Sequence, residues 1–205
     1  MASQKTKLDD KIKFFHWPQE VEIPKEFHSI DEMGEFTTCC MCEKKVKESG
    51  EPYLIERSFK RVNESYENVL FEYAICFDCA RKMNEAMSKE SMAKLETYFS
   101  QYLTGERQRM KLEESQNDSM AWFNHCMVKG TAREDIFEYN ICGLFRGDKM
   151  LLGEFPYLLS LEAMEEITEL LSAETKDELD DFRRNHLGGP PEFEELLKGR
   201  PVFIF

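Results

Sequence analysis

The alternation of bulky and polar residues is clearest in the first half of the chain. Residues 53–61, YLIERSFKR, alternate along their length, and residues 66–75, YENVLFEYAI, are rich in aromatic and β-branched side chains. The polar stretch VNES between them supplies a turn. Period-two alternation on both sides of a turn is typical of a β-hairpin. The pattern therefore predicts a hairpin that runs directly into Cys76.

Helical patterns follow this hairpin. The stretch CARKMNEAM, which begins at Cys79, predicts a short helix. Ser88 can cap a second helix, because its hydroxyl can accept a hydrogen bond from a free amide of the first turn. Gly105 lies just past the expected end of that helix. Five apolar side chains of the second helix share one face: Met92, Leu95, Phe99, Tyr102 and Leu103.

The second half of the chain shows strands first and helices afterwards. Residues 136–145 and 149–159 predict two strands around the turn RGDK. Ser160 can cap a helix, and Thr175 with Glu178 has the spacing of a capping box that opens another. A further helix is expected behind Pro190, and the closing residues PVFIF are expected to form a strand. Together the elements predict an α+β fold.

Composition adds a strong negative charge. The 205 residues include 27 Lys plus Arg against 40 Asp plus Glu, which gives a formal net charge of −13 at pH 7. Proteins that bind nucleic acid present positive surfaces to the phosphates. The balance therefore argues against nucleic acid and favours a protein partner with a basic surface. A small basic face keeps nucleic-acid binding as an alternative: Lys44, Lys45, Lys47, Arg57, Lys60 and Arg61.

The N-terminal residues carry charge throughout and lack an apolar segment typical of a secretory signal. No stretch approaches the roughly 18 to 20 apolar residues that cross a bilayer. We therefore expect a cytoplasmic protein without a membrane span. In a reducing compartment, paired cysteines bind metal more often than they form disulfides.

Four of the seven cysteines form two C-x-x-C pairs, Cys39 with Cys42 and Cys76 with Cys79. Zinc takes four thiolates in a tetrahedron, and two intervening residues let one turn present both sulfurs to one ion. The pairs therefore predict one structural Zn²⁺ ion held by all four cysteines. Buried free thiols, a redox pair at a helix start and an iron–sulfur cluster are the alternatives. Cys40 is an alternative to Cys39 as the first ligand.

The order of first pair, hairpin, second pair and helix resembles the treble-clef class of zinc modules over about residues 37–88. The resemblance implies a knuckle for the first pair and a first helical turn for the second. The 33 residues between Cys42 and Cys76 exceed the usual spacing of about 15 to 20. Doubling a loop costs only about 0.6 kcal/mol. Structural zinc contributes on the order of 10 kcal/mol or more, so the long insert is compatible with the site.

These features divide the chain into four segments. Residues 1–36 are expected to form an irregular N-terminal arm with one short strand, and residues 37–104 the treble-clef-like zinc module with its following helix. The almost wholly polar residues 105–119 are the expected linker. Residues 120–205 are expected to form a C-terminal α+β domain with a hairpin and short helices.

Two short similarities raise the question of an internal duplication. FEYAIC, which ends at Cys76, resembles FEYNIC, which ends at Cys142, and CCM from Cys39 resembles HCM from His125. This alignment loses half of the metal ligands. The alternatives are a duplication whose second copy lost its metal and chance similarity in sequence rich in Phe and Glu, and we favour chance.

His125, Cys126 and Cys142 are the other residues with candidate chemistry. They are compatible with a thiol–imidazole pair, with a second metal site or with ordinary packing. Adjacent residues on a strand point to opposite faces, which disfavours a direct contact between Cys126 and His125. We therefore assign no catalytic residue.

These observations favour a zinc-binding, non-enzymatic protein that acts as a protein-interaction module. A catalytic zinc keeps one coordination position open, whereas this chain supplies four thiolates. The first alternative is a thiol- or metal-dependent enzyme that uses Cys126 and His125, and the second is nucleic-acid binding through the zinc module. The oligomeric state and the identity of the partner stay open.

Overall fold

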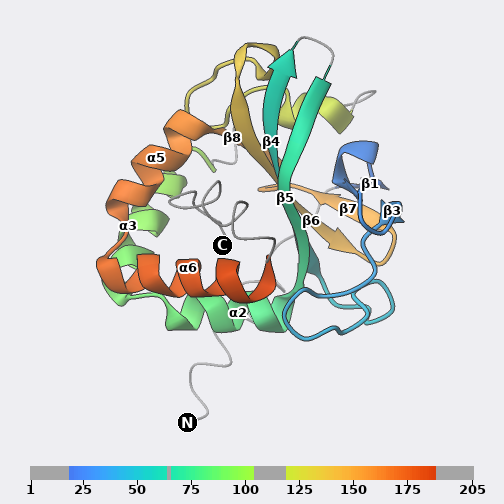
Figure 1. Ribbon diagram of the computed structural model, residues 1–205, viewed down its shortest axis with the longest axis horizontal. Helices are drawn as coiled ribbons and strands as arrows, with labels where there is room; N and C mark the ends of the chain where they lie inside the picture. Colours follow the sequence, from blue (N-terminus) through green and yellow to red (C-terminus); the bar gives the residue numbers. More distant parts are fainter. Residues whose placement is uncertain (1–18, 64–65, 104–118, 188–205) are drawn as a thin grey trace.

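The computed structural model describes residues 19–63, 66–103 and 119–187. These residues form an antiparallel sheet with four α-helices on one side of it (Figure 1). The predicted α+β class is confirmed at this level. The predicted helix behind Pro190, the predicted strand at 201–205 and nearly all of the predicted linker at 105–119 lie outside the described residues.

Strand β4 (Tyr53–Asn63) is the centre of the sheet. It pairs on one side with β5 (Tyr66–Cys76), which is the predicted hairpin, and on the other side with β6 (Glu138–Arg146). Both pairings are antiparallel. Strands from the two predicted parts of the chain therefore share one sheet, while the boundary between those parts stays a prediction.

The far side of β6 carries two short strands, β7 (Lys149–Leu152) and β8 (Tyr157–Ser160). The single strand predicted over 149–159 is wrong, because residues 153–156 leave the sheet between them. Pro156 has no amide hydrogen for a ladder bond, which favours an interruption at this point. Strand β1 (Gln19–Glu22) pairs with β7 and completes the sheet.

The described part of the predicted N-terminal arm contains more regular structure than the one expected strand. Beyond β1 it forms the 3-10 helix η1 (Lys25–Phe27) and two short paired strands, β2 (His28–Ser29) and β3 (Gly34–Glu35). Phe27 is fully buried and lies edge-on to the rings of Phe123 and Phe145. The arm therefore joins the core of the second half of the chain.

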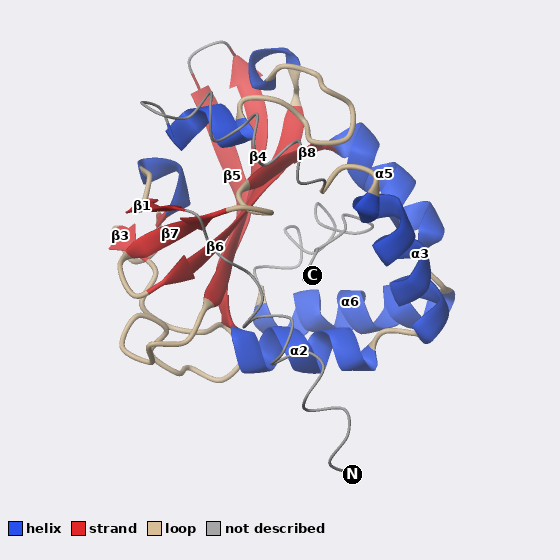
Figure 2. Cartoon of the chain, turned by 180° about the vertical axis from the view of Figure 1, so that it is seen from behind, coloured by secondary structure: helices blue, strands red, loops and turns tan. Residues whose placement is uncertain are grey.

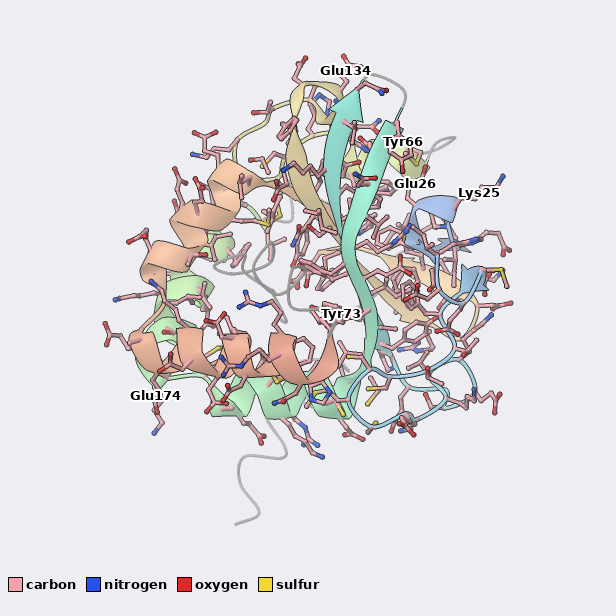
Figure 3. The ribbon with its side chains drawn as sticks, in the orientation of Figure 1. Lys25, Glu26, Tyr66, Tyr73, Glu134 and Glu174 are labelled. Atoms are coloured by element: carbon pink, nitrogen blue, oxygen red, sulfur yellow. The ribbon has the colours of Figure 1, made fainter. Side chains whose placement is uncertain are left out.

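The described residues include four α-helices, which follow one another along the chain in two groups. Helices α2 (Phe77–Ala86) and α3 (Lys89–Ser100) follow β5, and helices α5 (Leu161–Leu170) and α6 (Ala173–His186) follow β8. Figures 1 and 2 both show α2 beside α6 and α3 beside α5. Helix α6 packs against the sheet where Phe182 lies edge-on to Tyr73 of β5, and Figure 3 shows Tyr73 near the end of this helix.

The helix starts depend on serine caps. Ser88 caps α3 and Ser160 caps α5, as predicted from the sequence. The predicted helix start at Thr175 is wrong, because α6 already begins at Ala173 with Ser172 as its cap. The amide of Thr175 donates to the Ser172 hydroxyl, so the capping oxygen belongs to the residue three positions earlier.

The sequence alignment of FEYAIC with FEYNIC is also wrong. FEYAIC lies on β5 and leads straight into α2, whereas FEYNIC has all but its first residue on β6 and continues along the sheet. The two segments flank β4 on opposite sides. They do not occupy equivalent positions in the fold, and their similarity is not the mark of a repeat.

A buried ion pair anchors the turn between β2 and β3 to the sheet. Arg57 on β4 and Glu72 on β5 lie 2.8 Å apart, and their side chains are 6% and 8% exposed. Glu72 also accepts hydrogen bonds from the Ser29 hydroxyl and the Ile30 amide. Arg57 donates to the carbonyl of Glu26. Removing either charge therefore leaves the other buried without its partner.

We predict that Glu72→Ala lowers the free energy of unfolding by about 3 kcal/mol, because it strands the buried Arg57 guanidinium. Urea unfolding followed by circular dichroism measures the change. The control is Glu90→Ala, which removes the exposed pair with Lys94 on α3 and should leave the midpoint unchanged. Equal effects of the two substitutions would contradict the anchoring role.

Candidate metal centre

The first cysteine pair lies on a tight turn before β4. The amide of Cys39 donates to the carbonyl of Lys44 at 2.9 Å, and the amide of Glu43 donates to the carbonyl of Cys39 at 2.9 Å. A β-bridge between Thr38 and Lys45 closes the turn. Glu43 has a φ of 58°, the left-handed conformation that lets the chain reverse so sharply.

The second pair lies where β5 becomes α2. Cys76 is the last residue of β5 and also the N-cap of α2, and Cys79 lies in the first helical turn. One helical turn separates their side chains, so both point to the same side of the helix start. The change from strand to helix therefore presents two sulfurs together.

Two hydrogen bonds hold the two pairs against each other. The amide of Cys40 donates to the carbonyl of Ala74 on β5 at 2.8 Å. The amide of Cys76 donates to the sulfur of Cys39 at 3.3 Å. The turn that holds Cys39 and Cys42 is thus fixed to β5 at Ala74, two residues before Cys76. No side-chain pattern identifies Ala74, because its contribution comes from the backbone carbonyl.

The four sulfurs of Cys39, Cys42, Cys76 and Cys79 all lie within 4.8 Å of one another. The Sγ atoms of Cys42 and Cys76 are 3.7 Å apart. Thiolates at about 2.3 Å around one tetrahedral ion are separated by about 3.8 Å. The predicted meeting of the two pairs is therefore confirmed, and the cluster fits a zinc-binding module.

Cys39 belongs to this cluster and Cys40 does not. The hydrogen bond from the Cys40 thiol lowers the pKa of Cys39 to about 4, and the amide of Cys76 acts in the same direction against the effect of burial. The same hydrogen bond raises the pKa of Cys40 far above its usual range. The Cys40 thiol thus donates to the first cysteine of the cluster, and Cys39 rather than Cys40 lies among the four grouped sulfurs.

Burial differs among the four cysteine residues. Cys39, Cys76 and Cys79 are buried, whereas Cys42 is exposed. Burial raises the pKa of Cys76 and that of Cys79, so both stay protonated at neutral pH in the absence of a metal. A metal ion that binds here must displace these protons, because the thiolate is the ligand.

The other candidate residues do not form a second cluster of metal ligands within the described part of the chain. Cys126 is 2% exposed and Cys142 is 4% exposed, whereas the His125 side chain is exposed. The Cys126 sulfur accepts hydrogen bonds from the amides of Lys129 and Ser160. Nothing places the His125 ring against that thiol.

The predicted basic face consists largely of paired charges. Lys44 and Lys47 form ion pairs with Glu51 and Glu35, and Arg57 is buried against Glu72. Arg61 pairs with Glu67 at 2.7 Å. These carboxylates neutralise most of the positive charge that the sequence alone suggested.

No known protein family, no curated protein and no solved structure matches this chain. Among the described helices, none combines the length and the apolar character needed to span a bilayer. The cytoplasmic location stays a prediction.

We predict that metal affinity falls steeply with pH. Binding expels at least the protons of Cys76 and Cys79, so the apparent affinity should decrease by at least roughly a hundredfold per pH unit between about pH 8 and about pH 6. Competition against a chromophoric chelator at several pH values measures the slope, and a pH indicator in weak buffer counts released protons. An affinity independent of pH would contradict the protonation states assigned above.

Proposed function

We propose that this chain is a zinc-binding, non-enzymatic protein in which one Zn²⁺ ion joins the turn at Cys39 to the start of α2. The single observation that supports it is the set of four sulfurs within 4.8 Å of one another. The proposed arrangement is treble-clef-like, with a turn, the β4–β5 hairpin and a helix start in that order. The ion would then stabilise the two ends of the 33-residue segment between Cys42 and Cys76, which contains the β4–β5 hairpin.

The spacing of the sulfurs supports a single ion. Each sulfur lies near the others at a distance that one tetrahedral shell provides. In an iron–sulfur cluster the cysteines bind different iron atoms, so their sulfurs must lie farther apart. Zinc fits because it favours four thiolates in a tetrahedron without redox chemistry.

The closed ligand set supports a structural role. Catalytic zinc sites keep a position for water or substrate, and four cysteines leave none. Cys126, the thiol of the alternative enzymatic hypothesis, is buried, and its sulfur accepts hydrogen bonds from the amides of Lys129 and Ser160. A nucleophile must reach its substrate, so this environment favours the non-enzymatic hypothesis.

The tip of the β4–β5 hairpin is the surface we propose for a protein partner. Val62, Tyr66 and Phe137 are 55%, 58% and 60% exposed. Tyr66 pairs with Asn63 at the hairpin end, and the amide of Arg61 donates to the carbonyl of Phe137, so the three apolar side chains come from adjacent positions. Figure 3 shows Tyr66 near this end of the hairpin.

A hollow of about 810 Å³ adjoins this tip. Its walls include Phe59 and Tyr66 from the hairpin, His125 and Glu134 from the segment before β6, and Arg61 and Arg133, which both pair with Glu67. Exposed apolar side chains beside a hollow are typical of protein contact surfaces. With a net charge of −13 on the whole chain, we propose a protein partner that presents a basic segment.

We predict about one zinc per chain in protein purified under reducing, chelator-free conditions. Cys42→Ser and Cys79→Ser should each abolish binding, because each removes one of four ligands. Cys142→Ser is the matched control, since Cys142 is a buried cysteine outside the cluster. Elemental analysis measures the content, and metal-free wild-type protein would contradict the proposal.

We predict that the immobilised full-length chain captures a basic protein from native extract, and that the yield falls as salt screens the charges. The double variant Val62→Ser/Phe137→Ser should reduce the yield at least about tenfold, which corresponds to about 1.4 kcal/mol. The control is Ile30→Ser/Met33→Ser, which changes two exposed apolar residues of the β2–β3 turn. Equal loss in both variants would exclude the hairpin tip as the contact.

A further inference from the structure

The turn that holds Cys126 repeats the backbone hydrogen bonds of the turn that holds Cys39. In both, the cysteine amide donates to the carbonyl five residues ahead, at 2.9 Å for Cys39 and 2.8 Å for Cys126. Its carbonyl accepts from the amide four residues ahead at the same two distances. That fourth residue has positive φ in both turns, 58° at Glu43 and 68° at Gly130. A β-bridge closes each turn: Thr38 with Lys45, and His125 with Ala132.

Each turn is attached in the same way to the strand that leads into a helix. The residue after the cysteine donates its amide to a strand carbonyl at 2.8 Å, from Cys40 to Ala74 and from Met127 to Leu158. Two residues after that carbonyl comes the N-cap of the helix, Cys76 for α2 and Ser160 for α5. In both halves the amide of the N-cap donates to the sulfur of the turn cysteine at 3.3 Å.

The helices continue this correspondence. Helices α2 and α5 both have 10 residues, and each is followed by a C-cap residue and then by a serine that caps the next helix. The two serines meet, with Ser172 Oγ 2.9 Å from Ser88 Oγ. The amide of Ser88 donates to the Thr175 hydroxyl and the amide of Ser172 to the Ser91 hydroxyl. Such a reciprocal exchange is what a local twofold axis produces.

The sheet has the same symmetry. In the pairing of β4 with β6, Tyr53 lies opposite Phe145 and Phe59 lies opposite Tyr139. Both pairs are stacked, at 5.5 Å and 5.2 Å between ring centroids. Glu56 and Cys142 are opposite each other midway between them. A twofold axis at this point exchanges the two strands and superimposes each aromatic pair on the other.

We infer that the chain is an internal duplication of one metal-binding module, and that the second copy carries a former site for a tetrahedral, thiolate-binding divalent ion. Its four ligand positions are Cys126, Lys129, Ser160 and Ala163. Their spacing repeats that of the first copy, because two residues separate the members of each pair. Only the first position keeps its cysteine, so the unchanged chain has no second metal site there.

The three positions without a cysteine now hold side chains with other environments. Lys129 reaches Glu162 at 3.5 Å and also pairs with Glu166 on the surface of α5. The Ser160 hydroxyl lies 3.4 Å from the Cys126 sulfur, so the first and third positions are already neighbours. Ala163 is fully buried at the fourth position. The backbone of the site is thus retained although its ligands are gone.

Restoring the cysteines tests the inference. The triple variant Lys129→Cys/Ser160→Cys/Ala163→Cys of the full chain should bind one more Co²⁺ or Zn²⁺ ion than the unchanged chain. Bound Co²⁺ should show the thiolate charge-transfer absorption of tetrahedral coordination. The same triple change in a Cys42→Ser/Cys79→Ser background should still bind one ion, so the result does not depend on whether the first site functions as proposed.

The register control replaces Lys129→Cys by Val128→Cys within the triple variant and should not gain the ion. Because a cysteine at buried Ala163 can disturb folding, the double variant Lys129→Cys/Ser160→Cys provides three thiolates without it, and it should bind Co²⁺ more weakly. Circular dichroism and unfolding report whether each variant folds. A folded triple or double variant that gains no ion, a register control that binds as well, or a double variant that does not fold would each overturn the inference.

Discussion

The antiparallel pairing of β4 with β6 is the contact from which the rest of the structure is organised. It joins residues between 78 and 92 positions apart in the sequence through a continuous ladder from Tyr53 to Lys60. Each strand then carries its own continuation on its outer side, β5 on β4 and β7 with β8 on β6. The helices follow from the ends of β5 and β8, so their side-by-side arrangement is set by this one pairing.

The candidate metal centre depends on backbone geometry as much as on cysteine. The amide of Cys40 and the carbonyl of Ala74 fix the distance between the first turn and β5, and the N-cap position of Cys76 fixes the direction of the third sulfur. The equivalent turn at Cys126 keeps this geometry with Ser160 at the cap. An ion that binds at the first site therefore joins segments that hydrogen bonds already hold together.

Local features of the sequence predicted local features of the structure. The hairpin, the serine caps of α3 and α5 and the four clustered cysteines follow from short-range patterns whose physical causes act within a few residues. The pairing of β4 with β6 could not be predicted in this way. The edge of β4 that β5 leaves open could accept any other strand of the chain. Identical letters in the sequence indicate FEYNIC as the counterpart of FEYAIC, but the two segments are not equivalent in the fold. The corresponding segment, Tyr157 to Ser160, shares only its tyrosine with Tyr73 to Cys76.

Cys42 is the exposed residue among the four clustered cysteines. In the proposed site this exposure bears on how quickly an ion exchanges, which is a different property from how tightly the ion is held. Affinity reflects all four bonds together, whereas departure begins with the bond that solvent reaches. A competing thiol or an oxidant meets Cys42 first, and loss of that single bond opens the shell from one side. In the proposed site, exchange of the ion would therefore begin at Cys42.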